Sequence, residues 1–155
     1  MKKSNRRLLR ERTLQVLYAY EMHKEGLSAI INGILADIEH GPDREFGIDL
    51  IHRVINHREE LDQKISERVA NWEMERIALI DKLLLRIGIA EILYSPDVPP
   101  KVSINEVIEI AKNYSTSNSG KFINGILDAI LNELKKSGNL NKSGRGLIDE
   151  SFSKK

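Results

Sequence analysis

The sequence of 155 residues contains no cysteine, which excludes disulfide bonds, thiolate nucleophiles and cysteine-ligated zinc or iron–sulfur sites. Only four histidines are present, and none forms the i, i+4 pair of a helical zinc site. The motifs G-x-x-x-x-G-K-[ST], G-x-G-x-x-G and G-x-S-x-G are absent as well. The sequence therefore gives no sign of a cofactor, a metal site or catalysis, and we expect a protein that is not an enzyme.

A secretory signal and a membrane span are also missing. The first residues are charged, and no apolar run follows them. The most apolar stretch, 76–94, still contains Asp81, Lys82, Arg86 and Glu91. One charged residue near the bilayer centre costs about 2.5–3.5 kcal/mol, so this stretch is not expected to cross a membrane. We expect a cytoplasmic protein.

The same stretch predicts the central helix of the fold. Its four charged residues do not fall on one side of a helix, so apolar side chains cover most of the circumference. Such a helix belongs inside a bundle, and we expect it to be capped near Asn71. Gly88 in its middle costs about 1 kcal/mol relative to alanine, which predicts the close approach of another helix.

Six further stretches have helical periodicity, and none has the two-residue alternation of a strand, which predicts an all-α fold of seven helices. Ser103 and Glu106 form an S-x-x-E capping box that predicts the start of one helix, and Gly138 predicts the end of the last. Beyond it, 138–155 has no periodic apolar pattern and is expected to be a flexible tail. The six stretches are 4–23, 27–38, 46–55, 61–69 (the last two as one bent helix or as two), the helix from Ser103, and 117–136.

The net charge of +1 conceals a segregation. Residues 1–12 contain six basic residues and one acidic residue, and 135–155 contain six basic and two acidic residues, so the residues between them carry −8. Basic ends on an acidic body favour contact of the ends with a polyanion. The alternative is that these terminal charges are only solvated.

The helix predicted at 4–23 has two distinct faces. Arg7 and Tyr18 are 11 residues apart, close to three turns, and so share an outer line with Glu11 and Leu14. An exposed tyrosine in line with arginine is typical of RNA binding, where arginine holds phosphate and the ring stacks on an unpaired base. The alternative is that Tyr18 packs on a neighbouring helix. The inner face consists of Leu9, Thr13, Val16, Leu17 and Tyr20.

Three segments together resemble the NusB family of bacterial transcription antitermination factors. The first is R-R-L-L-R-E-R-T-L-Q-V-L-Y at 6–18. The second is L-L-R-I-G-I-A-E-I at 84–92, followed by D-V-P-P-K-V-S-I-N-E-V-I-E-I-A-K at 97–112. The third is G-K-F-I-N-G-I-L-D at 120–128. The order and spacing of these pieces are specific, and the resemblance covers about residues 1–136.

The resemblance implies one RNA-binding domain over 1–137, built of two small helical bundles that share the central helix. The bundles are expected at about 1–70 and 72–137. The resemblance also implies a non-enzymatic factor that pairs with NusE, the ribosomal small-subunit protein, and binds boxA RNA of ribosomal RNA operons. The pair is expected to act in the antitermination complex of RNA polymerase. A scaffold or homodimer without sequence-selective RNA binding is the alternative function.

The resemblance also implies particular site residues. Asp81 and Glu75 match the family's NusE-facing side. Phe122 is a special case, because its periodicity alone places it in the core. Gly125 is expected to allow a close approach to the central helix. Residues that match RNA-contacting positions of the family are Arg6, Arg7, Arg10, Tyr18, Asn118, Lys121 and Phe122.

Overall fold

The structure, a computed structural model, describes residues 5–148, apart from the side chains of Asn71 and Trp72. The described residues form helices and no strand, which confirms the predicted all-α class. The helices are α1 (Arg6–His23), α2 (Leu27–Ile34), α3 (Pro42–Asn56), α4 (Arg58–Ser66), α5 (Asn71–Arg76), α6 (Leu79–Tyr94), α7 (Pro100–Tyr114), α8 (Ser117–Ser137) and the short 3₁₀ helix η1 (Gly144–Leu147).

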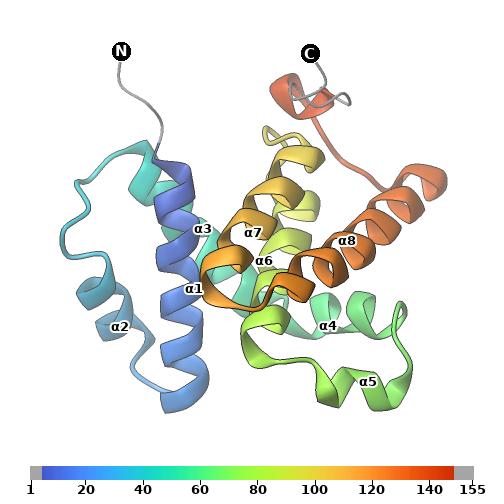
Figure 1. The fold of residues 1–155 in the computed structure, drawn as a ribbon. Helices are drawn as coiled ribbons and strands as arrows, with labels where there is room; N and C mark the ends of the chain where they lie inside the picture. Colours follow the sequence, from blue (N-terminus) through green and yellow to red (C-terminus); the bar gives the residue numbers. More distant parts are fainter. Residues whose placement is uncertain (1–4, 149–155) are drawn as a thin grey trace.

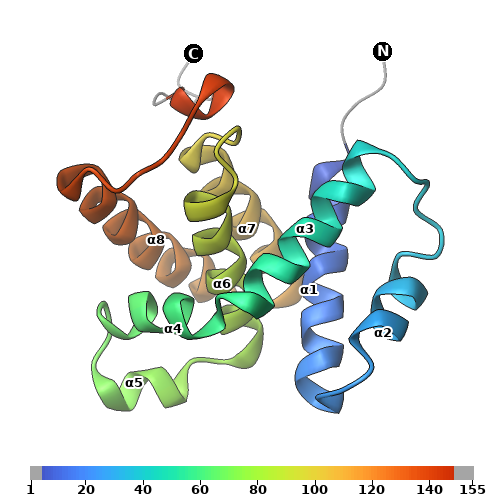
Figure 2. The same cartoon turned by 180° about the vertical axis from the view of Figure 1, so that it is seen from behind.

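The central helix of the fold is α6, as its composition predicts. Eleven of its sixteen residues are buried, and it packs against α1, α3, α4, α7 and α8. In Figure 1 and Figure 2, α1, α2 and α3 lie on one side of α6, and α7 and α8 lie on the other. Burial of its apolar side chains on several sides therefore couples the two halves of the molecule.

The predicted start of this helix is wrong. Residues 71–76 form the separate helix α5, and the chain is extended at Ile77 and Ala78 before α6 begins at Leu79. The described residues therefore contain eight α-helices rather than seven. Ile77 packs against the core in this extended connection, so the apolar pattern continues across the break and conceals it.

Two other features of the helix boundaries differ from the predictions, and one open alternative is decided. Helix α2 ends at Ile34 rather than at residue 38, and the Arg44 guanidinium donates hydrogen bonds to the carbonyl oxygens of Leu35 and Ile38 just beyond it. The stretches 46–55 and 61–69 belong to two helices, which are separated at His57.

The second difference is the predicted capping box at the start of α7. This helix begins at Pro100, a residue suited to the first turn because it has no N–H to leave unpaired. Ser103 is therefore inside the helix and buried, and its hydroxyl donates to Glu91. Glu106 binds arginines of α1 instead of a helix end. The S-x-x-E pattern reflects contacts with other helices and is not a capping box.

Two glycines test the predicted close helix approaches. A Cβ atom at Gly88 would lie 2.8 Å from Cδ1 of Leu127 on α8, so the predicted approach is confirmed there. A Cβ atom at Gly125 would meet nothing within 4 Å, so the expectation for Gly125 is wrong. Of these two glycines, only Gly88 is required by packing.

The start of the predicted tail packs on the folded body. Helix α8 ends at Ser137, with Gly138 in the left-handed conformation as predicted. The chain then returns to the end of α6, where the Lys142 ammonium donates to the carbonyl oxygens of Glu91 and Ser95. Residues 139–148 therefore make specific contacts that the composition of the tail did not predict. Residues 149–155 lie outside the described part of the chain.

Candidate nucleic-acid interface

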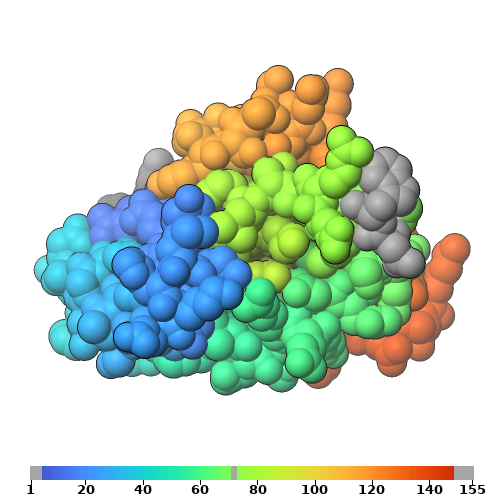
Figure 3. Space-filling view, turned by 90° about the horizontal axis from the view of Figure 1, so that it is seen from below, coloured from blue at the N-terminus to red at the C-terminus, as the bar shows by residue number. Residues whose placement is uncertain are grey.

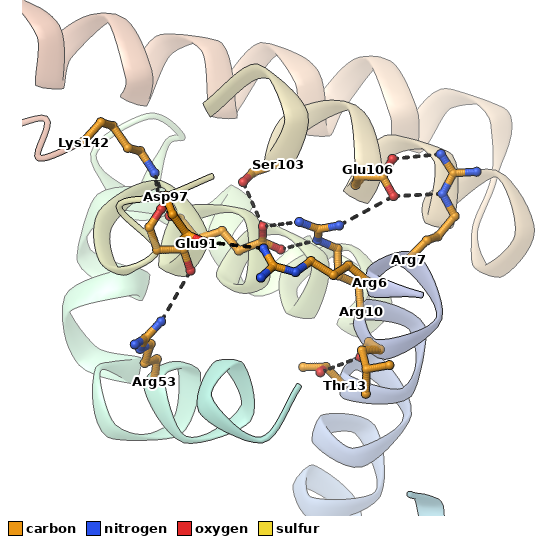
Figure 4. A network of polar contacts seen from close by, with 12 residues as sticks. Arg6, Arg7, Arg10, Thr13, Arg53, Glu91, Asp97, Ser103, Glu106 and Lys142 are labelled. Atoms are coloured by element: carbon orange, nitrogen blue, oxygen red, sulfur yellow. Dashed lines mark hydrogen bonds and ion pairs between the residues drawn. The ribbon is translucent and has the colours of Figure 1, made fainter. Parts of the chain in front are cut away.

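A buried polar network fixes the first half of α1 to the centre of the fold (Figure 4). The guanidinium of Arg10 donates two hydrogen bonds to the Glu91 carboxylate, from Nε at 2.6 Å and from Nη2 at 2.8 Å. The Ser103 hydroxyl donates a third at 2.8 Å. Arg10 and Glu91 are 3% and 0% exposed. An ion pair can be buried at low cost when both oxygens of the carboxylate accept hydrogen bonds from the guanidinium and a further donor binds the carboxylate, as Ser103 does here.

This network corrects the prediction for Arg10. Burial lowers the pKa of its guanidinium, but the charge of Glu91 and the hydrogen bonds to it act in the opposite direction and leave the pKa raised. Arg10 is therefore a permanently charged residue that is sealed inside the protein. It is not on the surface that could receive RNA, and it positions α1 on α6 and α7.

Arg7 and Arg6 remain accessible at the same end of α1. Arg7 donates to both oxygens of Glu106 on α7 at 2.8 Å, and its side chain is 56% exposed. The hydrogen bonds from Arg7 keep the pKa of Glu106 low. Arg6 lies 3.7 Å from Asp97 and stacks over the Phe46 ring at 4.4 Å. Both cations are oriented by neighbours and still reach the surface.

Tyr18 is on the surface, as the helical angle predicts. It is 42% exposed, whereas Leu14, which was predicted on the same outer line, is 1% exposed and belongs to the main core. Leu14 is buried because it packs in the same core cluster as apolar residues of α6 and α7. The exposed outer line is therefore interrupted between Glu11 and Tyr18.

Tyr114, at the end of α7, is a candidate that the sequence interpretation missed. It is 37% exposed, and its hydroxyl accepts a hydrogen bond of 3.0 Å from Nε2 of Gln15. Gln15 precedes Tyr18 by about one turn of α1, so this bond brings the outer face of α1 to the α7–α8 turn. A second tyrosine just before the third family-like segment is a signal that could have identified it.

The first turns of α8 carry the remaining predicted RNA-binding residues. Asn118 and Lys121 are exposed, and Phe122 is 37% exposed. The periodicity of α8 places Phe122 in the core, but the structure leaves it at the rim. Figure 3 shows the residues around the α7–α8 turn, in orange, as a ridge that stands out beside α1 and the start of α6. We name Tyr18, Tyr114 and Phe122 the aromatic corner.

Asp81 corrects the partner-binding prediction. It is 8% exposed, and its two carboxylate oxygens accept hydrogen bonds of 2.8 Å from the hydroxyls of Ser115 and Ser119. The carboxylate therefore holds the start of α8 on the start of α6, where it has little surface to offer a partner. Glu75, the other residue of this prediction, is exposed on α5.

The predicted site residues fall into two groups rather than one. Arg6 and Arg7 lie at the beginning of α1, whereas Tyr18 lies in its second half, where Gln15 also binds Tyr114. The α7–α8 turn lies beside α1 in Figure 1. The 11 residues from Arg7 to Tyr18 span about 16 Å at 1.5 Å per residue. The candidate surface is thus a strip along α1 and not a single compact patch.

Two chemistries are not indicated by residues 5–148. The described part contains no group of three or more His, Asp or Glu side chains that could hold a metal ion. None of its helices is both long enough and apolar enough to span a bilayer. What the described surface does offer is exposed aromatic rings on α1, α7 and α8 together with exposed cations on α1 and α8. Such an arrangement suits single-stranded nucleic acid.

Comparisons with known proteins agree with this geometry. The NusB from Chloroherpeton thalassium, a transcription antitermination protein, is 53% identical over 150 residues, which cover 94% of this chain and 70% of that protein. The solved structure of NusB from T. maritima superposes with a TM-score of 0.78 at 35% identity, covering 85% of this chain and 94% of the other.

A more distant solved structure contains the antitermination factors NusB and NusE in complex with double-stranded RNA. It matches with a TM-score of 0.76 at 23% identity, covering 86% of this chain and 99% of the other, and supports the fold. The profile of the NusB family matches residues 7–132, which include α1 and most of α8. The chain therefore belongs to the NusB family.

Proposed function

We propose that this chain is a transcription antitermination factor that binds boxA RNA of ribosomal RNA operons together with NusE. Its role is to help RNA polymerase read through terminators. Membership of the NusB family supports this, because the curated relative is a transcription antitermination protein. The distant solved complex, in which a NusB protein is bound with NusE and RNA, supports the two partners.

The observation that carries the RNA-binding part is the aromatic corner. Tyr18, Tyr114 and Phe122 are exposed although aromatic residues are only 5% of the chain. Every base has a π-face, so exposed rings bind unpaired bases by stacking. Lys121 lies next to Phe122 and supplies a cation for the phosphate backbone of the RNA. Asn118, one turn earlier, supplies an amide that can hydrogen-bond to a base edge.

Arg6 and Arg7 extend the proposed RNA surface along α1. Both are exposed to some degree, and a guanidinium that already has one carboxylate neighbour retains donors for a phosphate. Arg10 is not part of this proposal, because its donors are used inside the protein. Its contribution is to keep α1, and therefore Arg7, in place.

The proposed NusE contact lies near α5, which is at the bottom of the molecule in Figure 1. Glu75 is exposed there, together with Glu73, whose carboxylate accepts a hydrogen bond from the Ala70 amide. Asp81 supports this side only indirectly. The factor would act in the cytoplasm and without catalysis of its own, as an adaptor between RNA, NusE and the polymerase complex.

An RNA shift assay tests the proposal. With NusE present, the chain should bind boxA RNA more tightly than a scrambled strand of equal length. Binding should weaken as salt rises, because neutralised phosphates release counterions. Equal binding of both strands would contradict a sequence-selective role. Sedimentation with and without RNA tests the alternative, since a homodimer that persists on RNA favours the scaffold.

A further inference from the structure

The segment 139–148 lies beyond the family match, which ends at residue 132, yet it is held at a defined place. Helix α6 ends at Tyr94, and a helix end leaves carbonyl oxygens without intrahelical partners. The Lys142 ammonium binds two carbonyl oxygens there, 3.0 Å from that of Glu91 and 2.8 Å from that of Ser95. The amide of Ser143 donates to the carbonyl oxygen of Pro96 at 3.0 Å.

Two glycines give this segment a shape that other residues would not adopt. Gly144 has a φ of +56°, in the left-handed region that favours glycine. A Cβ atom at Gly146 would lie 1.8 Å from the carbonyl oxygen of Pro96, which leaves no room for any side chain. Gly146 is itself buried. The sequence K-S-G-R-G at 142–146 is therefore fitted to the end of α6.

The docked segment places Arg145 at an open pocket of about 790 Å³. One wall of this pocket is the beginning of α1 with Arg6 and Arg7, and another is the α6–α7 connection around Pro99. In Figure 1, η1 stands above the start of α7, at the same end of the molecule as the start of α1. Four arginines line this pocket, the accessible Arg6 and Arg7 and the buried Arg10 from the start of the chain and Arg145 from its end, beside the carboxylates of Asp43, Asp97 and Glu106.

The charges in this pocket single out Arg145. Glu106 is bound by Arg7, and Asp97 lies close to Arg6. Arg10 is bound by Glu91 underneath. Arg145 is exposed, and its guanidinium forms no hydrogen bond or ion pair with any of residues 5–148. A guanidinium with five unused donors, on a segment whose backbone is docked on Pro96, is suited to a phosphate group.

We propose that the docked tail completes a phosphate-binding pocket in which Arg145 acts with Arg6 and Arg7 on the backbone of the bound RNA. This inference rests on the proposed function, and it adds the path of the strand along α1. Helix α1 runs from the pocket to Tyr18, about 16 Å from Arg7. A strand whose bases stack at the aromatic corner can therefore follow α1 and reach the pocket with its phosphates.

The experiment measures binding of boxA RNA and of a scrambled single strand, each over a series of salt concentrations. Arg145→Ala should weaken both strands about fivefold, because a phosphate contact carries no sequence information. The slope of log affinity against log salt should fall by about 0.7, the value for one phosphate on a single strand. Arg145→Lys should recover part of the affinity because it retains the charge.

Lys136→Ala is the matched control, since it removes one exposed cation at the far end of α8. Lys136→Ala should change the RNA affinity, and the slope of log affinity against log salt, by less than Arg145→Ala does. Gly146→Ala tests the docking itself, because the new Cβ would push the segment off Pro96. It should weaken binding as Arg145→Ala does, and the double variant should bind no worse than either single variant.

The outcomes separate this inference from the proposed function. If wild type shows no preference for boxA but Arg145→Ala still weakens both strands, the pocket stands and the sequence-selective function fails. If wild type prefers boxA and Arg145→Ala leaves affinity and slope unchanged, the pocket is overturned and the function stands. Additive losses in the double variant would overturn the role of docking. No binding of either RNA by wild type would overturn both proposals.

Discussion

The two halves of α1 use polar and aromatic side chains in opposite ways. In the first half, Arg10 is sealed against Glu91 and builds the fold. In the second half, Tyr18 and Gln15 stay at the surface, where Gln15 only orients a second tyrosine. The comparison shows that residue type alone does not decide the role of a side chain. What decides it is whether α6 and α7 cover that side of α1 at that level.

Among the variants that test this comparison, removal of Glu91 should have the largest effect, a loss of stability. Glu91→Ala removes the bidentate partner of the buried Arg10 charge and leaves it only Glu106, at 3.7 Å. We expect a loss of about 3–5 kcal/mol in the free energy of unfolding, measured with urea. The control is Asp37→Ala, which removes the exposed carboxylate partner of Arg12 on the same helix and should change little. If the two variants lose the same stability, Arg10 reaches water and its assignment as a buried positioning residue fails.

Asp81→Ala should have the next largest effect on stability. The hydroxyls of Ser115 and Ser119 lose their acceptor, which we expect to cost about 1–3 kcal/mol in urea unfolding. Affinity for boxA RNA should also fall, because the start of α8 loosens. Glu75→Ala is the comparison: it should weaken binding to NusE in a pull-down titration and leave stability unchanged. The reverse pattern would show that Asp81 contacts the partner directly.

Tyr18→Ala should separate binding from stability. Stacking on one base contributes about 1–3 kcal/mol, so affinity for boxA RNA should fall by about five- to 150-fold in a shift assay. The urea midpoint should stay within experimental error, since the ring is 42% exposed. Met22→Ala, which removes another exposed apolar side chain one turn away, should bind RNA normally. A large loss of helix in circular dichroism would show that the ring supports the core.

The smallest effect concerns the pH dependence of tail docking. Burial lowers the pKa of Lys142 from an ordinary 10.5 to about 8. Between these values the undocked segment binds more protons than the docked one, so docking strengthens as pH rises through this window and is constant below it. Side-chain NMR of Lys142 should give a midpoint near 8. In Gly146→Ala, where the segment is undocked, the midpoint should return towards 10.5; equal midpoints would contradict the docked contact.

Much of this fold follows from local patterns. The apolar run at 76–94 predicts the central helix, because it leaves no polar face for solvent, although the helix begins only at Leu79. The exposure of Tyr18 follows from its angle on α1, and the need for Gly88 follows from the cost of glycine inside a helix. Each of these depends on the period of one helix, which the sequence states directly.

Other parts depended on contacts between distant residues. Nothing near Arg10 in the sequence announces Glu91, which is 81 residues away, so its burial was not predictable from its own helix. The same is true of Asp81 with Ser119 and of Glu106 with Arg7. The periodicity of α8 predicts a buried Phe122, whereas Phe122 lies at the rim and is 37% exposed, although Ser119 and Ile123 in the same turns are buried.

The sequence by itself determined the all-α class, the central helix and the family, because helical period and family motifs are properties of short stretches. Only the tertiary structure decided which arginine of α1 is structural, where the aromatic corner forms, and that the tail returns to the end of α6. These outcomes depend on which helices cover which surface. Burial, charge pairing and steric fit are properties of residues brought together from distant parts of the chain.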